Sequence, residues 1–140
     1  MTADNHRSVT LERLSTGAYL ARNARGDELR FGSAEGAGFS PVELLLASIG
    51  GCSAVDVDIV TARRAEAEVF SVEVEADIEK TDGATRLRDI LVSFRLVFPE
   101  GEGGDEARAR IPRSIQRSHD STCTVSRTIE AGEPVQMRIL

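Results

Sequence analysis

The chain has 140 residues, a length that suits one domain with a substantial hydrophobic core. Its formal net charge is −6 and only 4% of its residues are aromatic, which argues against a basic nucleic-acid-binding surface and against a platform for stacking bases. We expect no membrane partner either, because no apolar stretch in the sequence approaches the roughly 20 residues of a membrane span.

Residues 1–9 are polar and lack the apolar core of a signal peptide. We therefore expect a single cytoplasmic domain over residues 1–140, in which residues 1–7 form a mobile tail. The two cysteines of a cytoplasmic protein are reduced at rest, so a structural disulfide is not expected. A bond between them would be transient and redox-linked.

Short strands are predicted at the start of the chain. Residues 8–32 contain alternating apolar positions, interrupted by turn-forming segments at 15–17 and 24–27. This pattern predicts two or three strands. The glycine-rich loop that follows at 33–39 has no GxGxxG pattern and gives no indication of phosphate binding.

A long helix is predicted over about residues 41–66. Ser40 suits the N-cap, Pro41 the first helical position, and Glu43 the third, where its side chain completes a capping box. Apolar residues then fall on most faces of the helix. Such a helix is expected to be buried in the interior of the protein.

A β-hairpin is the clearest prediction in the sequence. Residues 69–80 and 86–98 each alternate between apolar and polar side chains, and Asp82-Gly83 between them is a strong turn signal. The polar face carries acids on the first strand, and we expect them to form ordinary cross-strand ion pairs with the arginines of the second strand. These arginines are Arg86, Arg88 and Arg95.

The C-terminal part is predicted to contain a loop, a helix that Pro112 starts or kinks, a short turn, a second helix and a last strand. These elements cover residues 99–105, 105–118, 119–122, 122–130 and 135–139. Strands, a buried helix, a hairpin, two helices and a strand make an α+β domain.

Cys52 lies inside the predicted long helix. A free cysteine in a buried helix can simply be a small apolar residue. The adjoining Gly50-Gly51 pair argues for more, because two glycines in a helix cost about 2 kcal/mol relative to alanines. The glycines must therefore provide close backbone packing or open space beside the thiol, and the sequence leaves both possibilities open.

Cys123 lies at the start of a predicted helix, where free amides and the helix dipole favour a thiolate. His119, four residues earlier, is a candidate to activate this thiol. It is also a candidate to join Cys52 and Cys123 in a metal site, although the CxxC and HxxxH spacings of zinc sites are absent. A serine hydrolase has no support, since GxSxG is absent and His6 lies in the tail.

Together these features resemble the OsmC/Ohr superfamily of thiol-dependent peroxidases. The resemblance lies in the segment 40–47 running into Gly50-Gly51-Cys52, in Cys123-Thr124-Val125-Ser126 further along the chain, and in the order of elements. It implies an OsmC-like fold. In this fold an intertwined homodimer buries long central helices between wrapped antiparallel β-sheets, with the active sites at the dimer interface.

The resemblance also implies a function in the oxidative stress response. Cys52 would be the peroxidatic thiol that reduces organic hydroperoxides, with hydrogen peroxide left open as a second substrate, and Cys123 would be the resolving thiol. No bound cofactor or metal is implied. An external dithiol, such as a lipoyl group, or a small thiol would reduce the disulfide.

The chain departs from the best-understood branches of this superfamily at two points. Those branches carry a glutamate where this chain has Val42, and Glu43, nine residues before Cys52, falls on the opposite side of the helix. Glu43 is therefore interpreted mainly as a capping residue, with a catalytic role as the alternative. The arginine that would stabilise the thiolate is best matched by Arg25 and next by Arg22, and either could be a surface charge only.

Two further functions stay open beside the peroxidase. The first is a non-catalytic or weakly catalytic dimer on the same scaffold that binds a small molecule or senses redox state. The second is the metal site described above. The position of Val42 favours the first of these alternatives, because it removes the glutamate that would orient the arginine.

Overall fold

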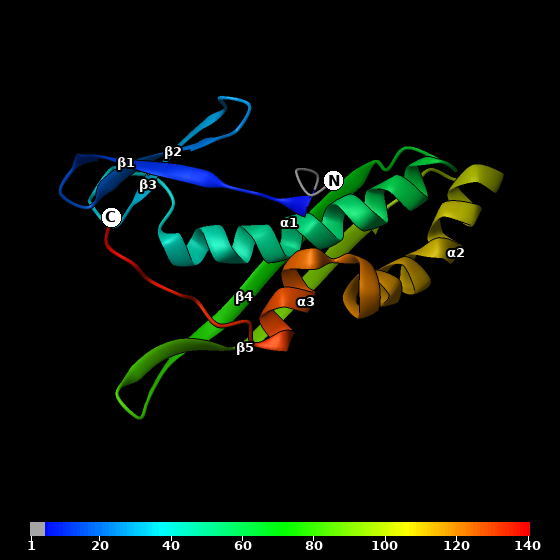
Figure 1. The fold of residues 1–140 in the computed structure, drawn as a ribbon. Helices are drawn as coiled ribbons and strands as arrows, with labels where there is room; N and C mark the ends of the chain where they lie inside the picture. The colour runs from blue at the N-terminus through cyan, green and yellow to red at the C-terminus, as the bar shows by residue number, and fades with distance from the viewer. Residues whose placement is uncertain (1–4) are drawn as a thin grey trace. The chain divides into compact units, whose positions relative to one another are not determined.

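The computed structural model describes residues 5–140, so part of the predicted tail, residues 1–4, lies outside the described residues. The described chain forms two compact units, one up to residue 45 and one from residue 46 to 140. In chain order (Figure 1) its elements are β1 (Val9–Ser15), β2 (Ala18–Asn23), β3 (Glu28–Gly32), α1 (Pro41–Ala62), β4 (Val69–Thr81), β5 (Ala84–Val97), α2 (Glu102–Arg117), the π-helical turn η2 (Ser118–Thr122) and α3 (Thr124–Ala131). Helices and antiparallel sheets confirm the predicted α+β class.

The N-terminal unit is a three-stranded antiparallel sheet in the order β1-β2-β3. Gly17 adopts a φ of 76° in the turn between β1 and β2, a conformation that glycine takes without steric cost. Leu20 and Phe31 are buried. The two or three strands predicted from alternation are therefore present, with both predicted turns between them.

The start of α1 has the predicted capping box. The Glu43 backbone N–H donates to Ser40 Oγ across 3.1 Å, and Glu43 Oε1 accepts the Ser40 backbone N–H at 2.9 Å. These two bonds satisfy amides that no helical carbonyl can reach. Glu43 is thus a capping residue in the structure. The helix ends at Ala62, four residues before the predicted end.

The predicted hairpin is present as β4 and β5, joined by a turn at Asp82-Gly83. Glu79 on its polar face forms ion pairs with Arg86 at 2.8 Å and with Arg88 at 3.6 Å, which confirms the predicted cross-strand pairing for these two arginines. Asp89, with a φ of 53°, lies where the register of β5 shifts by a bulge.

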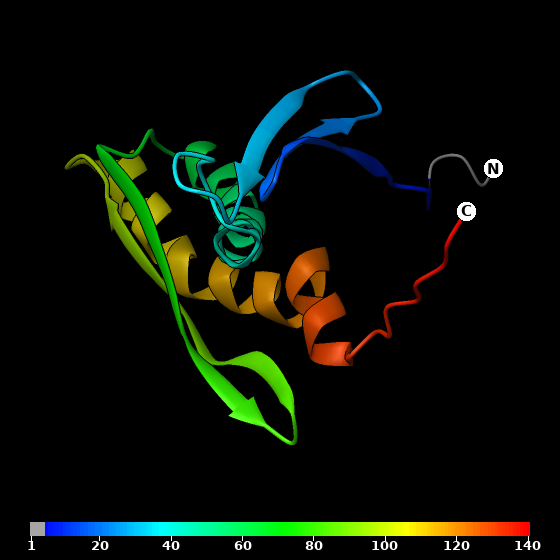
Figure 2. The same cartoon turned by 90° about the vertical axis from the view of Figure 1, so that its left-hand side faces the viewer.

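Gly50 explains how α1 packs on the hairpin. A Cβ atom at this position would lie 2.4 Å from Cγ2 of Val74 on β4, so only glycine fits at this distance. Gly51 has no such neighbour within 4 Å. Figure 2 shows the β4–β5 hairpin beside the α1 helix and the α2–α3 segment. Of the two roles that the sequence left open for the glycine pair, Gly50 therefore has the role of close backbone packing.

The burial of α1 differs from the prediction. Only four of its residues are buried, and they are Ile49, Gly50, Val57 and Thr61. Val55 and Ile59 are 57% and 53% exposed. The expectation of a helix buried on all sides is wrong for one chain, because the hairpin and the α2–α3 segment cover only part of its circumference.

Helix α1 also corrects the expectation about membrane spans. In the part of the chain that the structure describes, its 22 residues are long and apolar enough to cross a bilayer by length and composition alone. Central helices of soluble proteins meet the same two criteria. This helix packs on β4 through Gly50, as a central helix does.

The C-terminal part contains three corrections. Helix α2 begins at Glu102 and continues through Pro112, so the proline does not start it. Cys123 precedes α3 as its N-cap. The predicted strand at 135–139 is wrong for one chain, since no strand within residues 5–140 pairs with residues 133–140. A strand needs a hydrogen-bonding neighbour, and the apolar side chains of this segment are exposed.

Candidate functional site

The structure brings the two predicted site cysteines together. Cys52 lies on α1 and is half-buried, whereas Cys123 lies just before α3 and is 0% exposed. Both are free thiols. They lie close enough for the thiol of Cys52 to interact with the sulfur of Cys123, and this interaction raises the pKa of Cys52 and lowers that of Cys123.

Cys123 is the thiol whose charged form the structure favours. Its Sγ accepts the backbone N–H of Ser126 at 3.4 Å, and the Ser126 Oγ lies 3.3 Å away. Burial raises the pKa of Cys123, but the hydrogen bonds from Ser126, Cys52 and Ser53 outweigh it and hold this pKa below its ordinary value. The predicted thiolate-favouring position at a helix start is therefore real.

Cys52 has the opposite environment. Burial is the largest cause of its raised pKa, and interaction with Cys123 and the negative charge of Asp56 add to it. The backbone N–H of Val125 opposes the shift without reversing it. The half-exposed thiol of the pair therefore holds its proton more strongly than the buried one.

Asp56 is a site residue that sequence reasoning missed. One carboxylate oxygen, Oδ2, accepts the hydroxyl of Ser118 at 2.8 Å and the hydroxyl of Thr122 at 2.9 Å. These bonds tie α1 to η2, the turn that leads into Cys123. A signal was available, because Asp56 is an acid four residues after Cys52 and thus on the same face of the helix.

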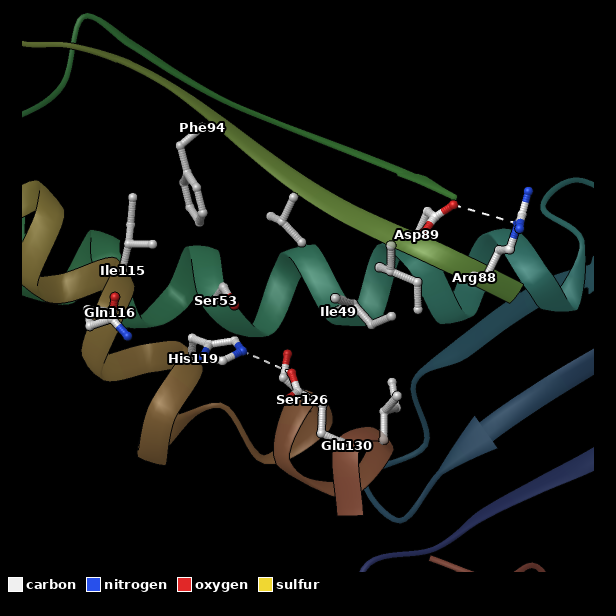
Figure 3. A pocket seen from close by; sticks show the side chains of 13 residues that line it. Ile49, Ser53, Arg88, Asp89, Phe94, Ile115, Gln116, His119, Ser126 and Glu130 are labelled. Atoms are coloured by element: carbon white, nitrogen blue, oxygen red, sulfur yellow. Dashed lines mark hydrogen bonds and ion pairs between the residues drawn. The ribbon is translucent and has the colours of Figure 1, made fainter. Parts of the chain in front are cut away.

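A cavity of about 580 Å³ lies among α1, β5, α2, η2 and α3 (Figure 3). Ser53 and Ser126, which both act on Cys123, lie in its wall, whereas neither cysteine does. Cys123 therefore lies next to two serines of the cavity wall. Most other side chains of the wall are apolar, and they come from α1, β5, α2 and α3: Ile49, Ile90, Val92, Phe94, Ile115 and Ile129.

His119 lies in the same wall, but it does not act on Cys123. Its Nδ1 lies 2.9 Å from a carboxylate oxygen of Asp120, and its Nε2 lies 2.9 Å from one of Glu130 (Figure 3). These carboxylates raise the pKa of His119 and favour the imidazolium form. With both ring nitrogens engaged, the suggested activation of Cys123 by His119 is not what the structure has.

The alternative of a metal site gains no support either. Within residues 5–140, no group of three or more histidine, cysteine, aspartate or glutamate side chains has an arrangement that could hold a metal ion. Cys52, Cys123 and His119 therefore do not form the proposed ligand set.

The two candidate arginines lie in the N-terminal sheet. Arg25 is exposed in the turn between β2 and β3, with its Nε 3.5 Å from Asp27. Arg22 on β2 bridges Glu12 and Glu28, each at 2.7 Å, and these two carboxylates raise its pKa. Both arginines thus have carboxylate partners within their own sheet.

Comparisons with known proteins agree with this arrangement of elements. The profile of the OsmC-like protein family matches residues 32–138. An uncharacterized protein of Mycobacterium tuberculosis is 26% identical over 133 residues, which cover 93% of each chain.

Two solved structures show the same fold. The OsmC-like protein of Mycoplasma pneumoniae superimposes with a TM-score of 0.71 at 16% identity, covering 92% of this chain and 90% of that one. The organic hydroperoxide resistance protein OhrB of Bacillus subtilis superimposes with a TM-score of 0.55 at 17% identity, covering 91% and 92%. The fold is thus OsmC-like, and this chain belongs to the OsmC-like protein family.

Proposed function

We propose that this chain is a thiol-dependent peroxidase that reduces organic hydroperoxides through Cys52 and Cys123. The observation that carries the proposal is the pair of interacting thiols next to a cavity whose wall includes six apolar side chains. An apolar cavity suits the organic part of a hydroperoxide. The name of the OhrB protein, whose fold this chain shares, supports the same class of substrate.

In the proposed reaction, Cys52 attacks because it is the more accessible thiol. Its sulfur takes the terminal oxygen of the hydroperoxide, the O–O bond breaks, and an alcohol leaves. Cys123 then attacks the sulfenic acid on Cys52, which forms a disulfide and releases water. An external dithiol of the lipoyl type or a small thiol reduces this disulfide, and the protein needs no bound cofactor.

The proposal includes a cation that stabilises the Cys52 thiolate. Arg25 is the first candidate for the cation and Arg22 the second. Glu43 is not included, because its carboxylate is used in the capping box.

We further propose that the working form is a cytoplasmic homodimer. Exposed apolar side chains support it, since Val55 and Ile59 lie one turn apart on α1 and Val9 and Leu11 lie on β1. Large apolar surfaces of this kind are typical of protein interfaces. The long helix whose sequence predicts burial on all sides would then be covered by the second copy.

The experiment is steady-state reduction of tert-butyl hydroperoxide by the reduced protein, with dihydrolipoamide or dithiothreitol as the electron donor. We expect turnover in the wild type, none in Cys52→Ser, and a stable sulfenic acid after a single turnover in Cys123→Ser. The peroxidase proposal fails if the wild type turns over no faster than Cys52→Ser.

A second candidate is a redox-sensing member of the same fold. The raised pKa of Cys52 favours it, because a protonated thiol reacts slowly with peroxide. A sensor would form the disulfide stoichiometrically with peroxide but would not turn over with either dithiol. Disulfide formation without turnover in the same assay would therefore favour this candidate over the peroxidase.

A further inference from the structure

The two thiols differ in their accessibility to solvent and in how strongly their surroundings favour the charged form. Cys52 is the more exposed, so a reactant from solvent meets it first, whereas Cys123 is 0% exposed. The donors of the site are gathered on Cys123, whose sulfur is in contact with Ser126, Ser53 and Cys52. A reaction at Cys52 is therefore followed by a reaction with a buried sulfur that already has hydrogen-bond donors around it.

Ser126 makes two of these contacts from one residue. Its backbone N–H lies 3.4 Å from Cys123 Sγ, and its hydroxyl oxygen lies 3.3 Å from the same atom. In the thiol form Cys123 Sγ donates to Ser126 Oγ, whereas in the thiolate form the hydroxyl turns and donates to Sγ. Because hydrogen bonds to a charged acceptor are stronger than those to a neutral one, the amide and the hydroxyl of Ser126 both favour the thiolate over the thiol. They also fix the side chain of Cys123, because the bond to the backbone is the cap of α3.

The remaining ionisable groups around the pair leave this arrangement intact. On α1, Asp56 acts on Cys52 and raises its pKa. On η2, the charged side chains of His119 and Asp120 bond to each other. On α3, Glu130 pairs with His119 and with Arg127. On β5, Arg88 and Asp89 line the same cavity and pair with each other. The negative charge of the pair is thus placed on Cys123, in agreement with its lowered pKa.

We propose that Ser126 is the positioning residue of the resolving step, because it holds Cys123 as a thiolate next to Cys52, ready to attack any oxidised form of the Cys52 sulfur. The proposal rests on the proposed function for the identity of the natural oxidant. It assigns to Ser126 a role in the second step, and it leaves the first step to Cys52.

The step balances without a further reactant. An electron pair of the Cys123 thiolate attacks the sulfur of the Cys52 sulfenic acid, the S–S bond forms, and the S–O bond breaks. The hydroxide that leaves takes one proton from solvent and becomes water. Because the thiolate form of Cys123 attacks without first losing a proton, a larger thiolate fraction speeds disulfide formation against further oxidation of the sulfenic acid to the sulfinic acid.

The test replaces peroxide by an aromatic disulfide, so that it does not depend on peroxidase activity. Dithionitrobenzoate reacts with Cys52 of the reduced full-length protein and releases one thionitrobenzoate. Attack of Cys123 on the Cys52 mixed disulfide then releases a second one, which is followed by its absorbance. The rate of this second release reports the fraction of Cys123 that is thiolate.

We expect the second release in the wild type to keep its rate down to a pH below 9.0, the ordinary pKa of a thiol. Ser126→Ala removes the hydroxyl but keeps the amide. Loss of one hydrogen bond to a charged group should move the midpoint of the pH profile upward by about one unit, which is about a tenfold slower release at a pH below both midpoints and an unchanged release above both.

Three variants serve as controls. Ser126→Thr restores a hydroxyl and should restore the wild-type profile. Ser121→Ala removes an exposed hydroxyl that bonds only the carbonyl of Arg117, and it should leave the profile unchanged. Cys123→Ser should abolish the second release while the first continues. Circular dichroism of each variant checks that α3 is still folded.

The proposal is overturned if Ser126→Ala releases the second thionitrobenzoate with the wild-type rate and pH midpoint. It is also overturned if the rate falls equally at all pH values, since that result would mean lost geometry without lost ionisation. A wild-type profile in this assay together with no turnover of hydroperoxide would instead sink the proposed function and keep the role of Ser126.

Discussion

The carboxylate of Asp56 accepts a hydrogen bond of 2.8 Å from the hydroxyl of Ser118, 62 residues further along the chain. Ser118 is 1% exposed, so this hydroxyl has no water to bond in place of the carboxylate. The bond joins the central helix to the turn that precedes Cys123. The distance between the two reactive sulfurs thus depends on a residue that is not one of them.

Two substitutions of Asp56 should show separately what its charge and its hydrogen bonds do. Asp56→Asn keeps one oxygen able to accept both hydroxyls, so we expect a change in stability within about 1 kcal/mol. It removes the negative charge beside Cys52, so the pKa of Cys52 should fall. Asp56→Ala leaves a buried hydroxyl without an acceptor and should cost about 1–3 kcal/mol. Urea denaturation and pH-dependent alkylation of Cys52 measure the two effects. Equal alkylation profiles for wild type and Asp56→Asn would contradict the charge effect.

The two glycines of α1 should respond differently to alanine. In Gly50→Ala the new methyl group meets Val74, whose branched side chain cannot easily move, and overpacking of this kind costs about 1–3 kcal/mol. Gly51→Ala is the matched control, since the same group meets no atom within 4 Å there and should change stability by no more than about 1 kcal/mol. Denaturant unfolding of both variants decides. A larger loss for Gly51→Ala would rule out close packing as the reason for Gly50.

The stability of the reduced protein should depend on pH in two opposite ways around 9.0, the ordinary pKa of both thiols. The folded state lowers the pKa of Cys123, so its contribution is present above 9.0 and is lost as the pH falls through the lowered value. The folded state raises the pKa of Cys52, so stability falls as the pH rises from 9.0 toward the raised value. Cys123→Ser should remove the first dependence and Cys52→Ser the second. Denaturation curves between pH 6 and pH 10 provide the test, and identical profiles for both variants would refute it.

The exposed face of α1 should control the oligomeric state. Val55→Arg places a charge on the apolar stripe that Val55 and Ile59 form, and such a charge is costly inside an interface. We expect the wild type to have the mass of a dimer in light scattering and Val55→Arg that of a monomer. Glu100→Arg, an exposed substitution in the loop before α2, should remain a dimer. A monomeric wild type at micromolar concentration would exclude the proposed dimer.

His119 should keep its proton to a higher pH than an ordinary histidine. Asp120 is the largest cause, through its bond to the ring, and Glu130 is the second partner. Asp120→Asn should therefore lower the pKa of His119, which an NMR titration of the ring protons measures. The raised pKa of His119 stabilises the folded state at pH values below 6.5, the ordinary pKa of histidine. This stabilisation is lost as the pH rises through the raised pKa. Asp105→Asn on α2 is the control and should leave the titration unchanged.

The sequence predicted best those features that depend on neighbouring residues. The capping box of Ser40 and Glu43 and the hairpin around Asp82-Gly83 need only local hydrogen bonds and local alternation, and both are present. The proximity of Cys52 and Cys123 was predicted through family resemblance, because no local pattern links residues so far apart.

Other features could not be predicted from a local pattern. The role of Gly50 depends on a valine of a different element, and the roles of Ser53 and Ser126 depend on the approach of α1 to α3. The division of charge between the two thiols is likewise a property of their surroundings. At residues 135–139 a local pattern predicted too much. The alternation there is clear, but within one chain the segment has no neighbouring strand to pair with.

The cap of α3 has one more consequence. Cys123 Sγ accepts the Ser126 amide, and a sulfur in a disulfide carries no charge and accepts a hydrogen bond only weakly. Oxidation of the pair therefore weakens the N-terminal turn of an eight-residue helix that has little length to spare. The oxidation state of the two sulfurs would then determine whether α3 is ordered or frayed. Another molecule could detect this change at the surface of α3 without contact with either cysteine.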